Sequence, residues 1–179
     1  MPPRHHLQME PETKSVRTSQ QCTGHTKTGA RCKRRTARTP LCWTHLKSEQ
    51  HLQIKTSGIP HTGLGLYTTI RRPAGKMVAP YTGHIVTRPE NTYTGEYVIQ
   101  LNHPPQAPPY KYIDANHTTS GAGRYSNMAR RRNHRTNNSR LRPDVQHPDR
   151  AKVMSTRSIP AGGEVLTTYG RSYSFPDER

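Results

Sequence analysis

From residue 54 to the C-terminus, the apolar residues of this chain occur in short runs that glycine and proline interrupt. Short apolar and β-branched runs bounded by turn-forming residues predict strands, and this part shows no sustained helical period. Residues 102–109 and most of 116–149 are expected to be irregular, with one short helix near 122–128. A mostly β domain therefore follows, with strands expected at 64–70, 77–79, 84–87, 97–101, 110–113, 153–156 and 165–169.

The composition limits the size of the core and the type of protein. Hydrophobic residues make up only 29% of the 179 residues, which predicts a modest core and some loop-rich or disordered chain. Residues 1–20 are polar and contain three prolines, so we expect a disordered tail and not a secretory signal. No stretch approaches the roughly 18 apolar residues of a membrane span. We therefore expect an intracellular chain without a membrane partner.

All three cysteines lie near the N-terminus, where an odd number cannot pair fully within one chain. Together with a histidine they give the spacing C-x9-C-x9-C-x2-H, and a Cys3His set is a common structural site for tetrahedral zinc. The predicted ligands are Cys22, Cys32, Cys42 and His45. His25 is an alternative ligand, and three ordinary thiols beside a surface histidine are the alternative explanation. A module as small as residues 21–48 would draw much of its folding free energy from the metal.

The formal net charge of +17 predicts a polyanionic partner, of which DNA or RNA is the first candidate. The alternative is that the charge serves solubility alone. Six Lys or Arg residues and no acidic residue lie between Cys22 and His45, which makes phosphate contact plausible there. A second basic run is either a nucleic-acid contact or a solvated loop. It comprises Arg130, Arg131, Arg132, Arg135, Arg140 and Arg142.

Six short motifs follow one another between residues 56 and 170. They are a Ser-bearing turn that ends in Gly63-Leu64-Gly65, Tyr81-Thr82-Gly83, Ile113-Asp114-Ala115, Arg124-Tyr125-Ser126-Asn127, an R-x-I-x-x-G-x-E-V segment at 157–165, and Tyr169-Gly170. In this order they resemble the motifs of SET-domain protein lysine methyltransferases. Each motif is short, but their shared order over about 110 residues is specific.

The resemblance implies a SET domain at residues 50–174, with a short tail at 175–179. Such a domain consists of several small sheets with a threaded, pseudoknot-like C-terminal segment. It would transfer a methyl group from S-adenosylmethionine to a protein lysine. The implied cofactor-binding residues are Gly63, Leu64, Gly65, Arg124, Tyr125, Asn127, Met128 and Asn138. The implied catalytic residues are Tyr169 and Tyr81, and Tyr97, Thr167, Tyr173 and Phe175 are expected along the lysine channel.

The sequence departs from the family pattern in four places. Met128 stands where the family usually has a histidine that packs near the adenine. The second asparagine of the cofactor motif is either Asn138, which a strand should follow, or Asn133, which has the commoner spacing. Thr167 leaves the number of added methyl groups open. No cysteine-rich segment follows Tyr169, so Tyr173 and Phe175, a second protomer or a bound partner would close the channel.

The charge also bears on the substrate. A free lysine has a pKa of about 10.4, and desolvation in an aromatic channel would favour its neutral form without a strong base. A basic enzyme repels a free basic peptide, but DNA between the two would ease that repulsion. We therefore expect the substrate to be a histone in chromatin, and the protein to be nuclear. A lysine on an RNA-bound protein is the alternative substrate. A hypothesis of another class is a zinc-containing nucleic-acid-binding protein with an inactive SET-like fold.

Overall fold

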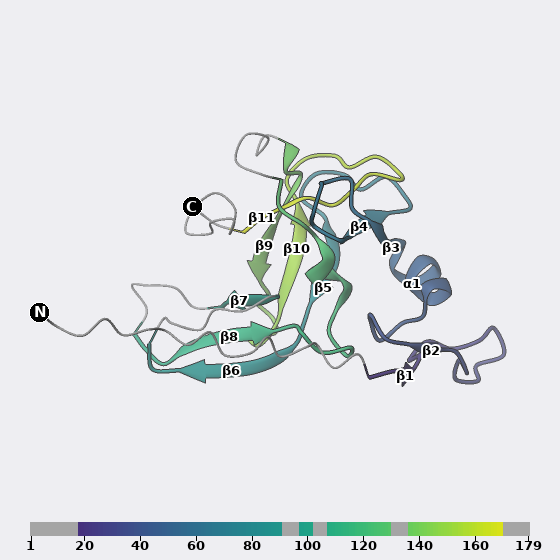
Figure 1. The fold of residues 1–179 in the computed structure, drawn as a ribbon, viewed down its shortest axis with the longest axis horizontal. Coiled ribbons are helices and arrows are strands. Elements are labelled where there is room, and N and C mark those ends of the chain that lie inside the picture. The colour runs from purple at the N-terminus through teal and green to yellow at the C-terminus, as the bar shows by residue number, and fades with distance from the viewer. Residues whose placement is uncertain (1–17, 91–96, 102–106, 130–135, 170–179) are drawn as a thin grey trace, which may run out of the picture.

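The computed structural model describes residues 18–90, 97–101, 107–129 and 136–169. Within them, the strands form four small sheets, as Figure 1 shows. One α-helix and one short 3-10 helix accompany these sheets in the described part of the chain. The predicted mostly β fold of several small sheets is confirmed.

The N-terminal part is a two-stranded sheet followed by a helix. Strand β1 (Gln20–Gln21) pairs antiparallel with β2 (Arg35–Thr36). Helix α1 (Trp43–Gln50) begins after Cys42 and ends at His51, which has a left-handed backbone (φ 55°). The sequence analysis did not predict this helix, because Leu46 is its only buried residue and leaves almost no apolar periodicity. The helix crosses the predicted boundary between residues 48 and 50.

The next two strands form a hairpin. Strand β3 (Leu52–Thr56) pairs antiparallel with β4 (Leu64–Thr68), with Leu52 opposite Thr68 and Thr56 opposite Leu64. Only β4 was predicted as a strand. The connecting loop is closed by a hydrogen bond from the Ser57 amide to the Gly63 carbonyl, 2.9 Å long. This loop carries the first of the six motifs.

The largest sheet has the strand order β11-β9-β10-β5. Its strands are β5 (Met77–Tyr81), β9 (Ser139–Pro143), β10 (Ala151–Ser155) and β11 (Thr167–Thr168). Strand β9 lies in the 116–149 region that was expected to be mostly irregular, but it begins directly after Asn138, where a strand was predicted. Strand β11 runs parallel to β9, whereas the other neighbours are antiparallel.

The third sheet has β8 (Tyr110–Asp114) at its centre, between β6 (His84–Arg88) and β7 (Val98–Gln100). Figure 1 shows this sheet below the four-stranded sheet, with its strands running across it. The turn between β5 and β6 joins the two sheets. A side chain at Gly83 would collide with the Asp114 backbone, so the close approach of this turn to β8 requires glycine.

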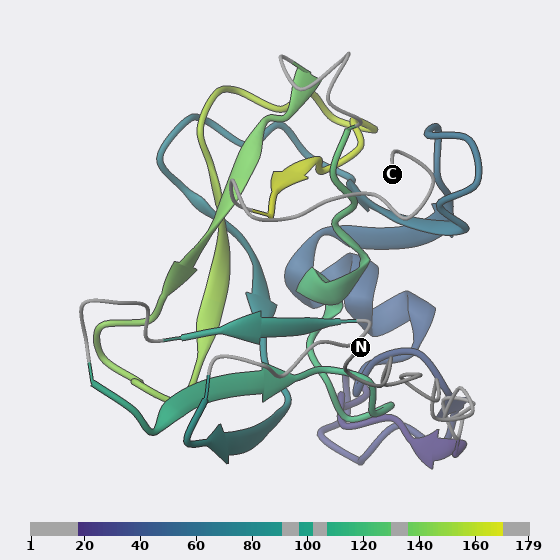
Figure 2. The same cartoon turned by 60° about the vertical axis from the view of Figure 1, so that its left-hand side comes forward.

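The predicted short helix near 122–128 is a 3-10 helix, η1 (Ala122–Tyr125), all of whose residues are buried. Figure 2 shows it at the centre of the molecule. A Cβ atom at Gly121 or Gly123 would lie 2.5 or 2.6 Å from the Pro80 carbonyl oxygen. Glycine at both positions therefore lets η1 pack directly against β5.

The main hydrophobic core is shared by the N-terminal module and the β domain. Buried residues of the module, including Leu41 and Leu46, belong to the same cluster as Leu66, Val153 and Val165 of the later strands. A smaller cluster around Tyr81 and Ile113 lies by the third sheet. Because one core joins both parts, the position of the module relative to the sheets is fixed by packing.

The C-terminal segment of the described chain lies between three earlier segments. The Val165 amide donates to the Leu66 carbonyl of β4 at 2.8 Å, and the Thr167 amide donates to the Asn127 carbonyl at 2.7 Å. Asn138 and Ser139 both donate their amides to the Leu166 carbonyl at 2.9 Å. This is the threaded arrangement that was predicted for the C-terminal segment. Among the described residues, no helix is both long and apolar enough to span a membrane.

Candidate functional site

The four predicted metal ligands come together in the folded chain. The three thiol sulfurs and one ring nitrogen of His45 all lie within 4.8 Å of one another. The His45 Nδ1 atom is 3.4 Å from the Sγ atoms of both Cys22 and Cys42. The three cysteines are buried and unpaired by disulfides. The alternative ligand His25 is excluded from this group, because its backbone carbonyl contacts the site and its ring does not belong to the cluster.

Hydrogen bonds around the cluster prepare its members for metal binding. The His45 Nε2 atom lies 2.9 Å from the His25 carbonyl oxygen, so Nε2 carries the proton and Nδ1 is free to be the ligand. The amides of Gly24 and Cys42 donate to the Cys22 sulfur at 3.4 and 3.1 Å. Burial raises the pKa of Cys42, but bonds from the His45 and Thr44 amides and contacts with Cys22 and His45 outweigh it and lower the pKa to about 6. This donor set fits a tetrahedral Zn²⁺ ion.

The predicted catalytic residue Tyr169 lies against the Arg124–Met128 segment. Its hydroxyl donates to the Ser126 carbonyl oxygen at 2.9 Å, and its amide donates to the Met128 sulfur at 3.2 Å. The residue is 36% exposed. The hydrogen bond to the Ser126 carbonyl fixes the orientation of the Tyr169 phenol.

A hydrogen bond joins the Tyr81 side chain to the backbone of Tyr97. The buried Tyr81 hydroxyl donates to the Tyr97 carbonyl at 2.8 Å. Burial raises the pKa of Tyr81 well above its usual value, and the neighbouring Tyr169 raises it further. Tyr81 is therefore a neutral donor throughout the physiological pH range. Tyr97 also brings its ring to 6.2 Å from that of Tyr125, so four tyrosines gather at this place.

Arg124 is the cation at the centre of this tyrosine group. Its guanidinium carbon lies 4.9 Å from the Tyr125 ring centroid and 5.5 Å from that of Tyr97. Its nitrogens donate to the carbonyls of Ala115, His117 (2.9 Å) and Arg38 (2.9 Å). The Tyr125 hydroxyl also reaches the Arg38 carbonyl, at 3.3 Å. These two predicted cofactor-binding side chains thus connect the Cys3His module to the loop that holds Tyr169, a role that the sequence analysis missed.

The two asparagines of the cofactor motif fix backbone segments. The Asn127 side chain donates to the Leu64 carbonyl at 2.9 Å. The Asn138 side chain forms two bonds with the threaded segment: Nδ2 donates to the Glu164 carbonyl at 2.8 Å, and Oδ1 accepts from the Leu166 amide at 2.9 Å. The alternative Asn133 lies outside the described residues. The predicted cofactor-binding residues are not tested by these contacts, and their roles stay predictions: Gly63, Leu64, Gly65, Arg124, Tyr125, Asn127, Met128 and Asn138.

Glu164 is a second residue whose role the sequence analysis missed, although it is the acidic position of the R-x-I-x-x-G-x-E motif. Its carboxylate accepts from the Ser57 hydroxyl at 2.6 Å, the Gly58 amide at 2.9 Å and the Tyr67 hydroxyl at 3.1 Å. Burial and the Glu164 charge raise the pKa of Tyr67. The carboxylate lies so close to Gly65 that a side chain there would collide with it. Glu164 therefore holds the loop that ends in Gly63-Leu64-Gly65.

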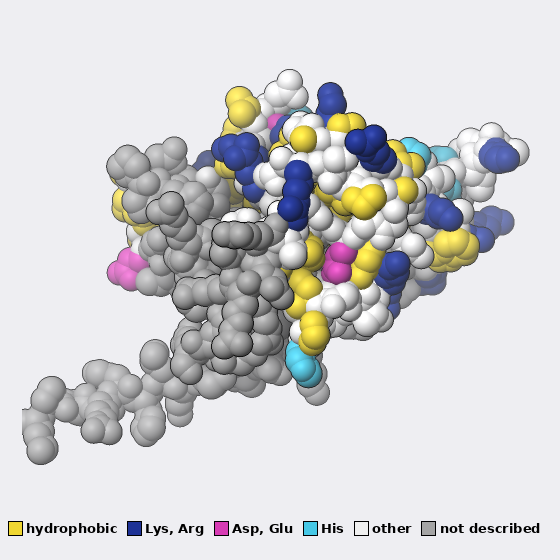
Figure 3. All heavy atoms as spheres, turned by 90° about the horizontal axis from the view of Figure 1, so that it is seen from above, with side chains coloured by type: hydrophobic (Ala, Val, Ile, Leu, Met, Phe, Trp, Pro, Cys, Tyr) yellow, Lys and Arg dark blue, Asp and Glu magenta, His cyan; other side chains and the backbone are white. Residues whose placement is uncertain are grey.

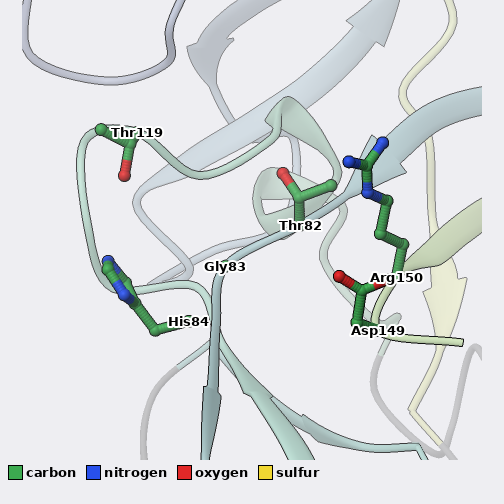
Figure 4. A pocket seen from close by; sticks show the side chains of 6 residues that line it. All are labelled: Thr82, Gly83, His84, Thr119, Asp149 and Arg150. Carbon is green, nitrogen blue, oxygen red and sulfur yellow. The ribbon is translucent and has the colours of Figure 1, made fainter. Parts of the chain in front are cut away.

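The remaining channel residues divide into two groups. Thr167 is fully buried, and its hydroxyl lies 2.6 Å from that of Ser139 on the neighbouring strand. Tyr173 and Phe175 lie outside the described residues, so the closure of the channel stays a prediction. The described cavity in Figure 4, of about 410 Å³, is elsewhere: Thr82, Gly83, His84, Thr119, Asp149 and Arg150 line it. None of these residues was predicted to bind the cofactor or the lysine.

The comparison with protein families decides the identity of the domain. The SET-domain family model matches residues 63–170. The chain belongs to the SET-domain family. Among solved structures, the methyltransferase domain of human PR domain-containing protein 2 is similar, with a TM-score of 0.54 and 18% sequence identity, over 74% of this chain and 86% of that chain. At this identity the likeness concerns the fold. No curated protein matches the chain with significance.

The SET domain offers a site whose residues fit S-adenosylmethionine. Gly63 has a positive φ of 69°, and a Cβ atom there would meet nothing within 4 Å, so the backbone beside it is open to a ligand. Asn127 links this turn to the segment that carries Ser126 and Met128. Tyr169 contacts that same segment through its hydrogen bonds to Ser126 and Met128. The glycine turn, the motif asparagine and the tyrosine are therefore parts of one connected site.

Proposed function

We propose that this SET-domain protein is an S-adenosylmethionine-dependent protein-lysine N-methyltransferase. The observation that carries the proposal is Tyr169, a residue 36% exposed whose hydroxyl is oriented by the Ser126 carbonyl beside the other tyrosines of the site. S-adenosylmethionine would supply a methyl group on a positively charged sulfur. The residues that would hold it are Gly63, Leu64, Gly65, Asn127, Met128 and Asn138.

The chain's own residues would prepare the lysine. Aromatic walls from Tyr81 and Tyr97 would exclude water, which favours the neutral amine over the ammonium ion. Tyr169 would accept a hydrogen bond from the lysine amine. This bond would direct the lone pair of the amine nitrogen towards the methyl group. Tyr81 stays protonated and donates to Tyr97, so it shapes the channel and does not remove the proton. Most of the rate acceleration would come from positioning.

We further propose that the substrate is a histone in chromatin. The +17 charge of the chain supports this choice, because DNA between two basic proteins relieves their repulsion. A lysine on an RNA-bound protein remains the alternative substrate. A nuclear location would follow from the chromatin substrate.

Calorimetry with S-adenosylmethionine tests the cofactor. We expect saturable binding to the purified zinc-loaded protein. Absence of binding at millimolar cofactor would overturn the enzyme proposal and favour an inactive SET-like protein, for which Met128 in place of histidine is the supporting observation.

Methyl transfer to nucleosomes and to free histones tests the substrate. We expect faster transfer to nucleosomes, with a rate that falls steeply as salt rises. Equal rates on free histones at all salt concentrations would remove the role of DNA, while leaving the methyltransferase proposal intact.

A further inference from the structure

The zinc module carries a large aromatic side chain that is open to solvent. Trp43, the only tryptophan of the chain, is the first residue of α1 and is 73% exposed. The Arg34 guanidinium carbon lies 5.2 Å from the centroid of its ring, and Arg34 also donates to the Thr44 hydroxyl. Neither the metal site nor the methyl-transfer site uses the Trp43 ring. A flat ring held beside a cation is the arrangement with which proteins stack nucleobases.

The surface around Trp43 is strongly basic, and the nearest carboxylate in sequence is Glu49 near the end of α1, beside Gly24. Between residues 18 and 48 there is no acidic residue, and the Lys and Arg side chains in this interval are exposed: Lys27, Arg31, Lys33, Arg34, Arg35, Arg38 and Lys47. At the right-hand end of Figure 3, where this module lies, the visible face shows Lys and Arg without carboxylates. Such a surface attracts phosphates and releases their counterions on binding.

A cavity of about 460 Å³ adjoins this surface. It is lined by Thr26, Thr28, Ala30, Arg31, Cys32, Lys33, Arg34, Thr44 and His45. Arg34 belongs to both features, because it lines the cavity and packs over the Trp43 ring. Threonine hydroxyls and cations on its wall can bond to phosphate, sugar or base edges. The stacking ring and the polar cavity are therefore contiguous.

We propose that the zinc module binds single-stranded nucleic acid through the surface formed by Trp43, Arg34, Lys33, Arg31 and Lys27. One base stacks on Trp43, and the cations contact the flanking phosphates. A single strand fits better than a duplex, because only an unstacked base can offer its face to a protruding ring. The site is separate from Tyr169, so this binding does not depend on methyl transfer.

The position of Trp43 provides a direct measurement. Because the chain has no other tryptophan, its fluorescence reports on this ring alone. We expect saturable quenching when the zinc-loaded full chain is titrated with a single-stranded oligonucleotide of roughly ten nucleotides, a mid-range site size for one binding module. A duplex of the same sequence should bind more weakly and quench less.

Variants separate stacking from charge, with affinities measured by the anisotropy of a labelled oligonucleotide. Trp43→Ala should weaken single-strand binding roughly 5- to 150-fold, the range for loss of one stacked base, and Trp43→Phe should retain part of the affinity. Lys33→Ala should lower the affinity and reduce the slope of its salt dependence by about 1. The matched control is Lys76→Ala, which removes an exposed cation from the turn before β5. It should change the affinity by less than about twofold.

Three outcomes would overturn the proposal. Unquenched Trp43 at saturating oligonucleotide would place the strand elsewhere. Equal binding of single strand and duplex with no effect of Trp43→Ala would reduce the interaction to nonspecific charge. Tighter binding of polyglutamate than of the oligonucleotide would point to an acidic protein partner instead. Because Trp43 lies outside the core, zinc content and thermal unfolding of Trp43→Ala should match the wild type.

Discussion

At the scale of single residues, the asparagines and tyrosines of the motifs act mainly through the backbone groups they hold. Asn138 makes two hydrogen bonds of 2.8 and 2.9 Å to the threaded segment. Asn127 makes one bond of 2.9 Å to the Leu64 carbonyl of β4 and a longer one of 3.4 Å to the Thr62 hydroxyl. Tyr169 is oriented by one carbonyl, that of Ser126. These residues therefore couple the stability of the threaded segment to the geometry of the proposed site.

Substitution of Asn138 should test that coupling. Asn138→Ala leaves the Leu166 amide and the Glu164 carbonyl without their side-chain partner, and each lost partner costs about 1–3 kcal/mol. We expect the free energy of unfolding to fall by about 2–6 kcal/mol in urea denaturation. Asn127→Ala, the matched control, should cost about half as much. Equal losses of unfolding free energy for the two variants would contradict the larger stabilising role of the two Asn138 hydrogen bonds.

Removal of the Tyr169 hydroxyl should affect the reaction and not the fold. Tyr169→Phe loses the oxygen that we propose orients the amine, and loss of one such polar group typically lowers kcat by about 10²-fold. The residue is half-exposed, so the melting temperature should stay near that of the wild type. Tyr112→Phe on β8 is the matched control and should keep full activity. Full activity of Tyr169→Phe would exclude Tyr169 as the catalytic residue.

At the scale of elements, the loop between β3 and β4 depends on a residue more than 100 positions away. Glu164 accepts hydrogen bonds from Ser57, Gly58 and Tyr67. The loop positions Gly63 at the start of the matched SET-domain segment. A single carboxylate thus sets the shape of the turn where we expect the cofactor.

Loss of this carboxylate should loosen the loop before it affects the sheets. In Glu164→Ala, the Gly58 amide loses its bond to the carboxylate, so we expect its hydrogen exchange to accelerate at least tenfold and S-adenosylmethionine binding to weaken. Amides in β10 should keep their protection. The control, Glu90→Ala, removes an exposed carboxylate after β6 and should leave Gly58 unchanged. Unchanged Gly58 exchange in Glu164→Ala would show that the loop is held by other contacts.

At the scale of the whole molecule, the zinc module and the SET domain are parts of one packed body. They share the main core, and the Arg38 carbonyl accepts bonds from Arg124 and Tyr125. The Gln20 side chain adds a bond to the Thr118 carbonyl at 2.7 Å. A change in the module should therefore reach the loop that holds Tyr169.

Removal of zinc should test this connection. Structural zinc supplies folding free energy to small modules, so a chelator should unfold residues 21–48, change the fluorescence of Trp43 and lower the melting temperature. We also expect weaker S-adenosylmethionine binding, because Arg124 and Tyr125 lose the Arg38 carbonyl. Added zinc should restore the fold of residues 21–48, the Trp43 fluorescence, the melting temperature and the cofactor affinity. If the chelated protein kept its Trp43 fluorescence and cofactor affinity, zinc would have no structural role.

The sequence by itself determined the mostly β fold, the Cys3His set that clusters as candidate metal ligands and the order of the SET-domain motifs. These features are local: turn residues bound the strands, and the ligands and motifs have fixed spacings. It also placed a strand after Asn138, because Leu141 fits the N-x-x-apolar continuation of the family that the motifs resemble. Helix α1 and strand β3 were missed, since α1 has a single buried residue and β3 is largely exposed.

Only the tertiary structure decided what the side chains of the motifs contact. The expected cofactor role of Arg124 stays a prediction, and the structure adds that its guanidinium donates to the carbonyls of Ala115, His117 and Arg38. Glu164 and Ser57 are 107 positions apart and still share a 2.6 Å hydrogen bond. Such partners depend on how strands far apart in the sequence are threaded and packed, and no local spacing encodes that arrangement. The sequence therefore determined which functional groups are present, and long-range packing determined which of them contact one another.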